Sequence, residues 1–249
     1  MAYYDFLNIV FAPLLQLPVL LAVIALALFI SLIVILVTKY TTNQVLMKKI
    51  KDDIKYHQKQ IKELKSEPAK ALEVQKKAME LNMKYMTHSL RPTLITLIPI
   101  ILIFGWMSSN FAYESIKPQQ EFSVTAFFEK NSNGNAEIVV PEEIKIVSDK
   151  TQRIENDKAA WALKGQDGEH VLEFVYNGER QQKSILITND NKYIEPIKKT
   201  GNGRIKSIQI NYIQKKIINL FGWKIGWLGT YIIFSIVFTM ALRKVMKVY

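Results

Sequence analysis

The sequence predicts an α-helical membrane protein with three transmembrane helices, a cytoplasmic antiparallel coiled-coil hairpin and an external β-sandwich-like domain. Three stretches contain no charged residue, namely residues 6–38, 92–113 and 225–242. A helix needs roughly 20 apolar residues to cross a bilayer, so each stretch is long enough to span one. Two polar blocks separate the three stretches. This arrangement excludes a purely soluble fold, a fibrous protein and a disordered chain.

The first hydrophobic stretch is a permanent span from near Leu14 to near Val37. A secretory signal peptide has a basic start and an apolar run of only about 7 to 15 residues, whereas the only charge before this stretch is Asp5. The predicted segments are the N-terminal external end with transmembrane helix 1 (residues 1–38), the cytoplasmic hairpin (39–91), transmembrane helix 2 (92–113), the external β domain (114–215), and transmembrane helix 3 with a cytoplasmic tail (216–249).

The distribution of charge predicts the orientation. Residues 39–91 contain 13 Lys and Arg against 6 Asp and Glu, whereas residues 114–215 contain 15 of each sign. Cytoplasmic loops carry an excess of Lys and Arg, and Trp residues form belts at the membrane surfaces. We therefore expect a multi-pass protein of the cell membrane with its N-terminus outside and its hairpin and C-terminus in the cytoplasm. Trp106, Trp223 and Trp227 suit an outer aromatic belt.

The basic block has two interpretations. Its lysines suit anionic lipid headgroups or the phosphates of ribosomal RNA. A solvated helix face that only sets the topology explains the same excess of charge. A DNA partner is not expected.

Apolar residues in the basic block follow the three-and-four spacing of a coiled coil. Pro68 interrupts the pattern, and proline suits the first turn of a new helix. The block therefore predicts two helices that fold back on each other. The seam positions are Met47, Ile50, Ile54, His57, Ile61 and Leu64 in the first arm, and Ala71, Val74, Ala78, Leu81, Tyr85 and His88 in the second.

A second stripe, Met79, Met83, Met86 and Leu90, lies beside the seam of the second arm. Flexible thioether side chains adapt to many apolar shapes, so this stripe suits the capture of varied hydrophobic segments. Packing on the first arm or against the bilayer edge is the simpler interpretation, and it is favoured by the residues alone.

Residues 114–215 predict a small β-sandwich of about seven short strands. Branched and aromatic residues alternate between turn signals, and the clearest hairpin joins its strands through Asn177-Gly178. The predicted strands are residues 122–128, 136–140, 144–147, 170–176 and 184–188.

The sequence offers little for catalysis. Cysteine is absent, and His57, His88 and His170 are scattered, so neither a metal site nor a disulfide is expected. No acidic pair, nucleophile triad or glycine-rich phosphate loop is evident. We expect no enzyme activity and no cofactor.

Hydroxyl side chains, rather than charges, mark the spans. The absence of a charge at mid-membrane disfavours energised transport. The hydroxyls fall in the half of each span that is predicted to be cytoplasmic, next to Lys39 and Arg91. They are Ser31 and Thr38 in the first span, Thr93 and Thr96 in the second, and Tyr231, Ser235 and Thr239 in the third.

Two roles explain these hydroxyls. If their faces converge, they form a hydrated recess that shortens the apolar path for a polar chain segment crossing the membrane. Alternatively, Ser and Thr bond to their own backbone or hold helices together. The residues alone favour the second role.

Motifs in the spans carry a resemblance. They are Ser89-Leu90-Arg91-Pro92 and Ile98-Pro99-Ile100 in the second span, and Gly226-Trp227-Leu228-Gly229-Thr230-Tyr231-Ile232 and Leu242-Arg243-Lys244 in the third. These motifs resemble the archaeal YidC-like membrane protein insertases, in the superfamily of bacterial YidC and the insertase subunit of the endoplasmic reticulum membrane protein complex. The third-span motif is the most specific. The long block of residues 114–215 departs from these relatives, in which it is often short.

The resemblance implies a hydrophilic groove, open to cytoplasm and lipid, that moves nascent hydrophobic segments into the bilayer without a cofactor. The implied partners are nascent membrane proteins, membrane lipid, the ribosome and a translocon. A basic residue associated with the groove is characteristic of several relatives, and Lys39 or Arg91 matches it by position. With the resemblance, the recess becomes the favoured role, and its expected lining is Ser31, Thr38, Lys39, Arg91, Thr93, Thr96, Tyr231, Ser235 and Thr239.

Two rival functions stay open at this point. A membrane-anchored surface receptor or adhesion module would work through residues 114–215 and use the helices as an anchor. An ion channel would require several copies of the chain, because three helices are too few to enclose an aqueous pore.

Overall fold

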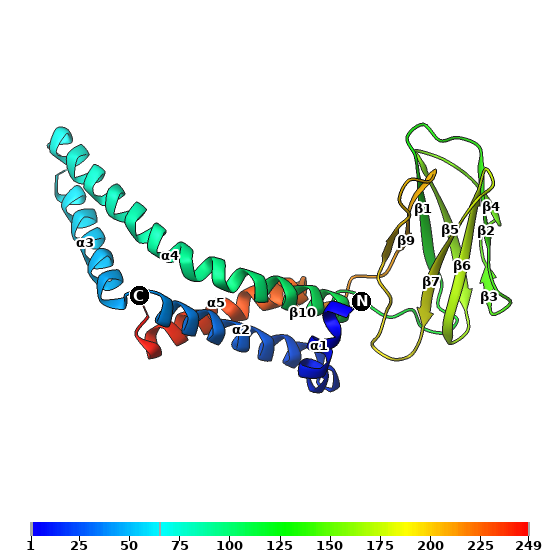
Figure 1. Ribbon diagram of the computed structural model, residues 1–249, viewed down its shortest axis with the longest axis horizontal. Coiled ribbons are helices and arrows are strands. Elements are labelled where there is room, and N and C mark those ends of the chain that lie inside the picture. The colour runs from blue at the N-terminus through cyan, green and yellow to red at the C-terminus, as the bar shows by residue number, and fades with distance from the viewer. Residues whose placement is uncertain (1, 65, 249) are drawn as a thin grey trace. The chain divides into compact units, whose positions relative to one another are not determined.

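A computed structural model describes residues 2–64 and 66–248 of the chain (Figure 1). The chain folds into two compact units. The helical unit consists of Met1–Gly105 and Ile217–Tyr249, and the β unit consists of Trp106–Lys216. The sidedness of each unit stays a prediction.

Among the described residues, three helices of the chain are long and apolar enough to cross a membrane: α2, α4 and α5. The helices and the hairpin strands are α1 (Ala2–Phe11), the 3-10 helix η1 (Ala12–Gln16), α2 (Val19–Thr41), α3 (Gln44–Glu63), α4 (Pro68–Phe111), β10 (Lys216–Leu220), β11 (Trp223–Gly226) and α5 (Trp227–Met246).

The first spanning helix begins later than the predicted start near Leu14. After η1, Leu17 is extended with ψ of 154°, and Pro18 is the N-cap of α2. The residue before a proline is disfavoured in helical conformation, so a helix cannot easily run through Leu17 into Pro18. The first apolar stretch is therefore divided between α1, η1 and α2.

α3 and the first half of α4 occupy the predicted hairpin. At the start of α3, the Asn43 Oδ1 accepts a hydrogen bond from the Leu46 backbone nitrogen at 3.0 Å, which is a typical N-cap. The predicted seam positions are buried or half-buried in both helices, except for His88, which is exposed. Coiled-coil packing between the two arms stays a prediction.

α4 runs without a break from the hairpin into the second span. Pro92 and Pro99 both lie inside this 44-residue helix. A proline removes one backbone donor from a helix. Around Pro92, the Thr93 hydroxyl donates to the Ser89 carbonyl at 2.9 Å and the Thr96 hydroxyl donates to the Pro92 carbonyl at 3.0 Å. These bonds occupy carbonyls in the turns around the proline, and the helix continues.

α5 also begins later than the predicted third segment. Residues 216–226 form a two-stranded hairpin, and α5 starts at Trp227. The two turn residues, Phe221 and Gly222, have φ values of 51° and 90°. A two-residue turn with both φ values positive has the twist of a β-hairpin, which explains why this segment is not helical.

α5 contacts both other spanning helices. It packs closely along α2, whose buried face includes Ala22, Ala27 and Ser31. Small residues let two helix backbones approach each other. Phe104 of α4 meets Tyr231 of α5 edge-on, with ring centroids 4.8 Å apart.

The β unit contains two antiparallel sheets. One has the strand order β3-β5-β1-β9-β8 and the other has the order β4-β2-β6-β7. The strands are β1 (Phe122–Phe128), β2 (Asn135–Val139), β3 (Ile144–Ile146), β4 (Thr151–Arg153), β5 (Lys158–Gly165), β6 (Gly168–Tyr176), β7 (Glu179–Ile187), β8 (Ile197–Lys199) and β9 (Ile205–Ile210).

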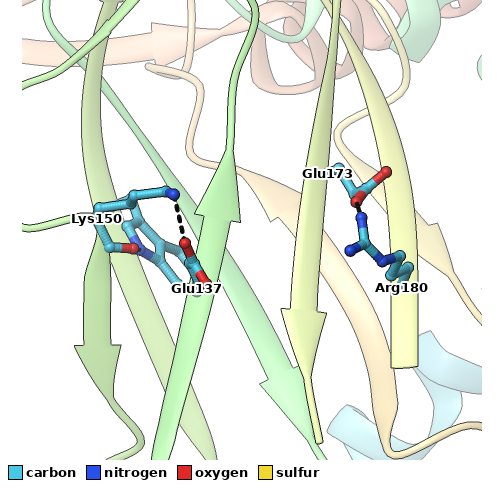
Figure 2. Close-up of polar contacts among 5 residues, drawn as sticks. Glu137, Lys150, Glu173 and Arg180 are labelled. Carbon is cyan, nitrogen blue, oxygen red and sulfur yellow. Dashed lines mark hydrogen bonds and ion pairs between the residues drawn. The ribbon is translucent and has the colours of Figure 1, made fainter. Parts of the chain in front are cut away.

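One apolar core lies between the two sheets. Trp161 of β5 and Phe174 of β6 belong to opposite sheets and pack edge-to-face, with ring centroids 5.4 Å apart. The outer faces carry polar residues instead. Figure 2 shows an ion pair between Lys150 and Glu137 at 2.5 Å and another between Arg180 and Glu173. Such surface pairs contribute about 0–1 kcal/mol each, so the core supplies most of the stability.

The five predicted strands correspond to β1, β2, β3, β6 and β7. The Asn177-Gly178 turn is also as predicted, because both residues have positive φ and Tyr176 pairs with Glu179. The prediction missed β5 and β9 among the longer strands. β5 contains alanine, lysine and glycine, which are weak strand formers, and it is fixed by pairing with β1 and β3.

Candidate functional site

A small cavity of about 90 Å³ lies in the helical unit, where α3 and the first half of α4 join the spanning helices. Its volume is sufficient for several water molecules. All four of the longer helices contribute to its wall. The lining residues are Val34, Thr38, Thr42, Met47, Tyr85, Ser89, Pro92, Thr93, Thr96 and Arg243.

Polar residues reach this cavity because they recur every fourth residue, which places them on one helix face. Tyr85, Ser89 and Thr93 follow this spacing on α4. Thr38 and Thr42 follow it at the end of α2. Met47 contributes from the first turns of α3.

The threonine hydroxyls of the cavity wall donate hydrogen bonds to backbone carbonyls one helical turn earlier. Thr38 donates to the Val34 carbonyl at 2.7 Å, and Thr42 donates to the Thr38 carbonyl at 2.6 Å. Thr93 and Thr96 donate to α4 carbonyls in the same way. A hydroxyl whose proton is used still has acceptor lone pairs. The cavity therefore offers hydrogen-bond acceptors along its wall.

Arg243 supplies the positive charge of the cavity. Within residues 2–64 and 66–248, no carboxylate lies within 4.0 Å of its guanidinium. Arg243 and Thr93 are both exposed, so the cavity reaches the protein surface. An arginine in such a place attracts carboxylates and can bind them through two parallel hydrogen bonds.

The structure separates the predicted lining residues into three groups. Thr38, Thr93 and Thr96 lie together on the cavity wall. Lys39 and Arg91 are exposed and do not line it. The four remaining residues, which lie between or beside α2 and α5, are Ser31, Tyr231, Ser235 and Thr239.

These four residues make contacts between helices. The Ser31 hydroxyl donates to the Ser235 carbonyl at 3.5 Å, and the Thr239 hydroxyl donates to Ser31 Oγ at 3.4 Å. Tyr231 is buried against Phe104. Hydrogen bonds of this kind hold membrane helices together. Whether these residues also meet a substrate stays a prediction.

Sequence reasoning did not include Arg243, Thr42, Tyr85 and Ser89 among the site residues. A signal for them was present. The run Tyr231, Ser235, Thr239 continues at the same interval of four to Arg243. Extending the hydroxyl series beyond the apolar stretches by one helical turn would have found Arg243, Thr42 and Ser89, and a second turn would have found Tyr85.

The methionine stripe lies on the exposed surface of α4. Met79, Met83, Met86 and Leu90 are 62%, 55%, 49% and 49% exposed. About half or more of each residue's surface is therefore exposed in the described chain. Packing of the stripe on the first arm or against the bilayer edge stays a prediction. The role of the stripe in capture stays a prediction.

The β unit contains a larger hollow of about 720 Å³, lined by loop residues that include Glu114, Lys117 and Lys215. Lys215 donates to Asn191 Oδ1 at 2.9 Å, and burial lowers the pKa of its amino group. In the described part of the chain, no three His, Asp or Glu side chains are grouped as metal ligands.

Three apolar helices that are long enough to span a bilayer define this chain as a multi-pass integral membrane protein. Residues 8–132, about half of the chain, match the family described as integral membrane protein EMC3/TMCO1-like. The chain belongs to this family, which is part of the YidC/Oxa1/EMC3 insertase superfamily. No curated protein and no solved structure matches the chain.

The matched residues include α2, α3, α4 and β1, and they end before α5. The family resemblance predicted from the sequence is thus confirmed. The third-span motif lies outside the match, and the archaeal branch of the superfamily stays a prediction. At the level of the family, the function is that of a membrane protein insertase acting on nascent membrane proteins.

Proposed function

We propose that this chain is a membrane protein insertase in which the Arg243 cavity receives the polar flank of a nascent membrane segment. The cavity itself is the observation that carries the proposal. It gathers threonine acceptors and one arginine at the hairpin end of three spanning helices. The apolar part of the substrate would move beside these helices directly into lipid.

The physical gain is a shorter apolar path. A charged residue at the centre of a spanning helix costs about 2.5 to 3.5 kcal/mol on insertion scales, and each unbonded backbone group adds several kcal/mol. The cavity lies at the end of the spans and offers hydrogen bonds there. A polar flank held in it would cross less hydrocarbon before it reaches the opposite surface.

Arg243 would select the flank by charge. Its guanidinium has no carboxylate partner among the described residues, so an acidic flank would not have to displace one. The acceptors of Thr38, Thr93 and Thr96 would bind amide donors of the same segment. This division of roles favours substrates whose translocated flank is short and acidic.

The methionine stripe would act before the cavity. Its exposed apolar surface consists mainly of flexible methionine side chains, which suit transient contact with varied hydrophobic segments. In this proposal the hairpin, with its excess of Lys and Arg, lies in the cytoplasm near the ribosome, and the N-terminus lies outside. A translocon would be a further partner.

Photocrosslinking tests the proposal. A benzophenone amino acid at Thr93, an exposed residue of the cavity wall, should form adducts with a stalled nascent membrane protein. Ile236, which is 55% exposed on α5 but does not line the cavity, provides the matched control. Adducts to the polar flank of the nascent protein that are absent at Thr93, or equally strong at Ile236, would overturn the proposal.

A further inference from the structure

The β10–β11 hairpin directly precedes α5 in the chain (Figure 1). Its turn exposes aromatic residues. Phe221 is 98% exposed and Trp223 is 78% exposed, and neighbouring Leu220 is 46% exposed. Large apolar side chains at this level of exposure usually have a partner outside the chain. The sequence and the hairpin geometry identify that partner.

The hairpin has one apolar face. A two-residue turn places Leu220 opposite Trp223 and Ile218 opposite Ile225, and side chains alternate between the two faces of a strand. These four apolar residues therefore share one face. Lys216 follows at the strand end of the same face, and the other face carries Ile217, Asn219 and Lys224. Such a hairpin is suited to a boundary between an apolar and a polar medium.

The turn sequence supports a role for Phe221 outside the fold. Phe221 has φ of 51°, a region that favours Asn, Asp and Gly. The equivalent turn of the β unit uses Asn177 at φ of 46°. A phenylalanine at the first turn position is conformationally unfavourable, so the turn itself does not require this residue, and its exposed apolar surface points to a contact outside the fold.

The hairpin is joined closely to the first turn of α5. A Cβ added at Gly229 would lie 2.5 Å from Ile225 Cγ2, so the absence of a side chain there lets β11 pack onto the helix. The Thr230 hydroxyl also donates to the Gly226 carbonyl at 2.9 Å. The position of the hairpin is therefore set by the position of α5 in the membrane.

The length of α5 places this hairpin at the bilayer surface. Its charge-free helical part, residues 227–242, extends about 24 Å at 1.5 Å per residue. The hydrocarbon core of a bilayer is about 30 Å thick. A short span is compensated by interfacial residues at its ends, and the hairpin provides Trp223, Phe221 and two lysines, Lys216 and Lys224.

We propose that the β10–β11 hairpin is a lipid-binding anchor in the interfacial layer of the bilayer. Phe221, Leu220 and Trp223 enter the boundary of the acyl chains, and Lys216 and Lys224 bind lipid phosphates. Aromatic and basic residues have these two preferences at membrane surfaces. The inference requires only that α5 spans a bilayer, and it does not depend on the insertase function.

Site-specific fluorescence quenching in the full-length chain tests the anchor. The chain has no cysteine, so Phe221→Cys and Asn177→Cys can each carry a single environment-sensitive dye. Both positions begin two-residue turns with positive φ, which makes them a matched pair. The chain is reconstituted in vesicles of phosphatidylcholine and phosphatidylglycerol, with either a nitroxide-labelled lipid or aqueous iodide as quencher.

We expect lipid-borne quenching roughly threefold or more stronger at position 221 than at position 177, because interfacial residues lie at the depth of the lipid headgroups. Iodide should show the reverse order. Equal access of iodide to both positions would overturn the anchor. A dye at position 221 that is protected from both quenchers would also overturn it, and would indicate a protein partner instead.

A second variant tests the contribution of the Phe221 side chain with the dye at a neighbouring position. With the dye at Leu220→Cys, the substitution Phe221→Asn should lower lipid-borne quenching by roughly half or more, because the largest apolar side chain at the tip is removed. Asparagine suits the turn better than phenylalanine, so the hairpin should stay folded. Unchanged quenching would contradict a role for Phe221 in the lipid contact.

Discussion

The β unit and the helical unit distribute polar and apolar side chains in opposite ways. In the β unit, Trp161 and Leu172 are almost fully buried, and charged residues lie on the outer faces. In the helical unit, Ile98 of α4 is 68% exposed, whereas Ser31 and Thr96 are 3% and 4% exposed. The first arrangement suits water outside, and the second suits lipid outside with polar groups gathered inside.

This difference assigns the apolar core that stabilises a fold in water to the β unit, and the buried polar residues of the candidate site to the helical unit. The β unit has a continuous apolar core and a ladder of backbone hydrogen bonds, which are sufficient for an independently folded domain. The spanning helices bury a minority of their most apolar segments inside the chain, which is the pattern expected of helices whose remaining surface faces lipid. The buried polar residues of the helical unit therefore need another explanation, and the cavity and the α2–α5 contact provide it.

The largest expected effect concerns the core of the β unit. Trp161→Ala should destabilise this unit by about 3–5 kcal/mol, because a large buried side chain leaves a cavity. Val171→Ala, at a position that is 47% exposed, is the control with a small effect. Thermal unfolding followed by circular dichroism measures the difference. Membrane insertion by the Trp161→Ala chain should persist at least in part, whereas its complete loss would favour a function that resides in the β unit.

Alkaline pH should also weaken the β unit selectively. Burial raises the pKa of Tyr193 and of Tyr212 to about 12, while a tyrosine in an unfolded chain titrates near 10. The unfolded state therefore releases protons first. The stabilising effect is complete below pH 10 and is lost as the pH rises from about 10 to about 12.

Melting temperatures of the full chain between pH 9 and pH 12 measure this effect. The double variant Tyr193→Phe and Tyr212→Phe is the control, since it should show a flatter dependence on pH. An equally steep decrease in both proteins would contradict the assignment to these tyrosines.

In the helical unit, the largest effect should come from Arg243. Loss of a hydrogen bond to a charged group costs about 1.5–3 kcal/mol, so Arg243→Gln should slow insertion of a substrate with an acidic flank roughly tenfold or more. Lys244→Gln removes the neighbouring charge, which does not line the cavity. An insertion assay in proteoliposomes compares the two variants. Equal losses would mean that only the overall charge matters.

The polar contact between α2 and α5 should have the smallest effect. Ser31→Ala removes two long hydrogen bonds, of 3.4 and 3.5 Å, and such bonds contribute about 0.6 kcal/mol on average in membrane proteins. A double-mutant cycle with Thr239→Val measures the coupling. A coupling near zero would indicate that close packing alone holds these helices.

Much of the fold is predictable from the sequence because its periodicities are strong. The three charge-free stretches correspond to α2, the second half of α4 and α5, and Asn177-Gly178 forms the expected turn. Boundaries were less predictable. α2 starts after Pro18 and not near Leu14, because a residue before a proline disfavours the helical conformation. Residues 216–226 form a hairpin and not part of a helix, because the Phe221-Gly222 turn sets the local backbone conformation there and apolar composition does not.

The candidate site was predictable only in part. Helical spacing between hydroxyls, of seven residues in the first span and three in the second, identified Thr38, Thr93 and Thr96, which meet on one cavity wall. It did not distinguish them from Ser31 and Thr239, because periodicity gives the face of a helix and not the neighbour that the face meets. The basic residue of the cavity was expected near the ends of the first two spans, and the structure supplies Arg243 from α5 instead.

Water access to the cavity is the decisive measurement for a hydrated site in the helical unit. Thr96 and Ile103 are 4% and 6% exposed and lie seven residues apart on α4, which places them on the same helix face. Since the chain has no cysteine, Thr96→Cys and Ile103→Cys can be compared in membranes with a charged, water-soluble thiosulfonate. Position 96 should react roughly tenfold or more faster than position 103, because water enters polar cavities and not apolar contacts. Equal rates at the two positions would contradict a hydrated site in this helical unit.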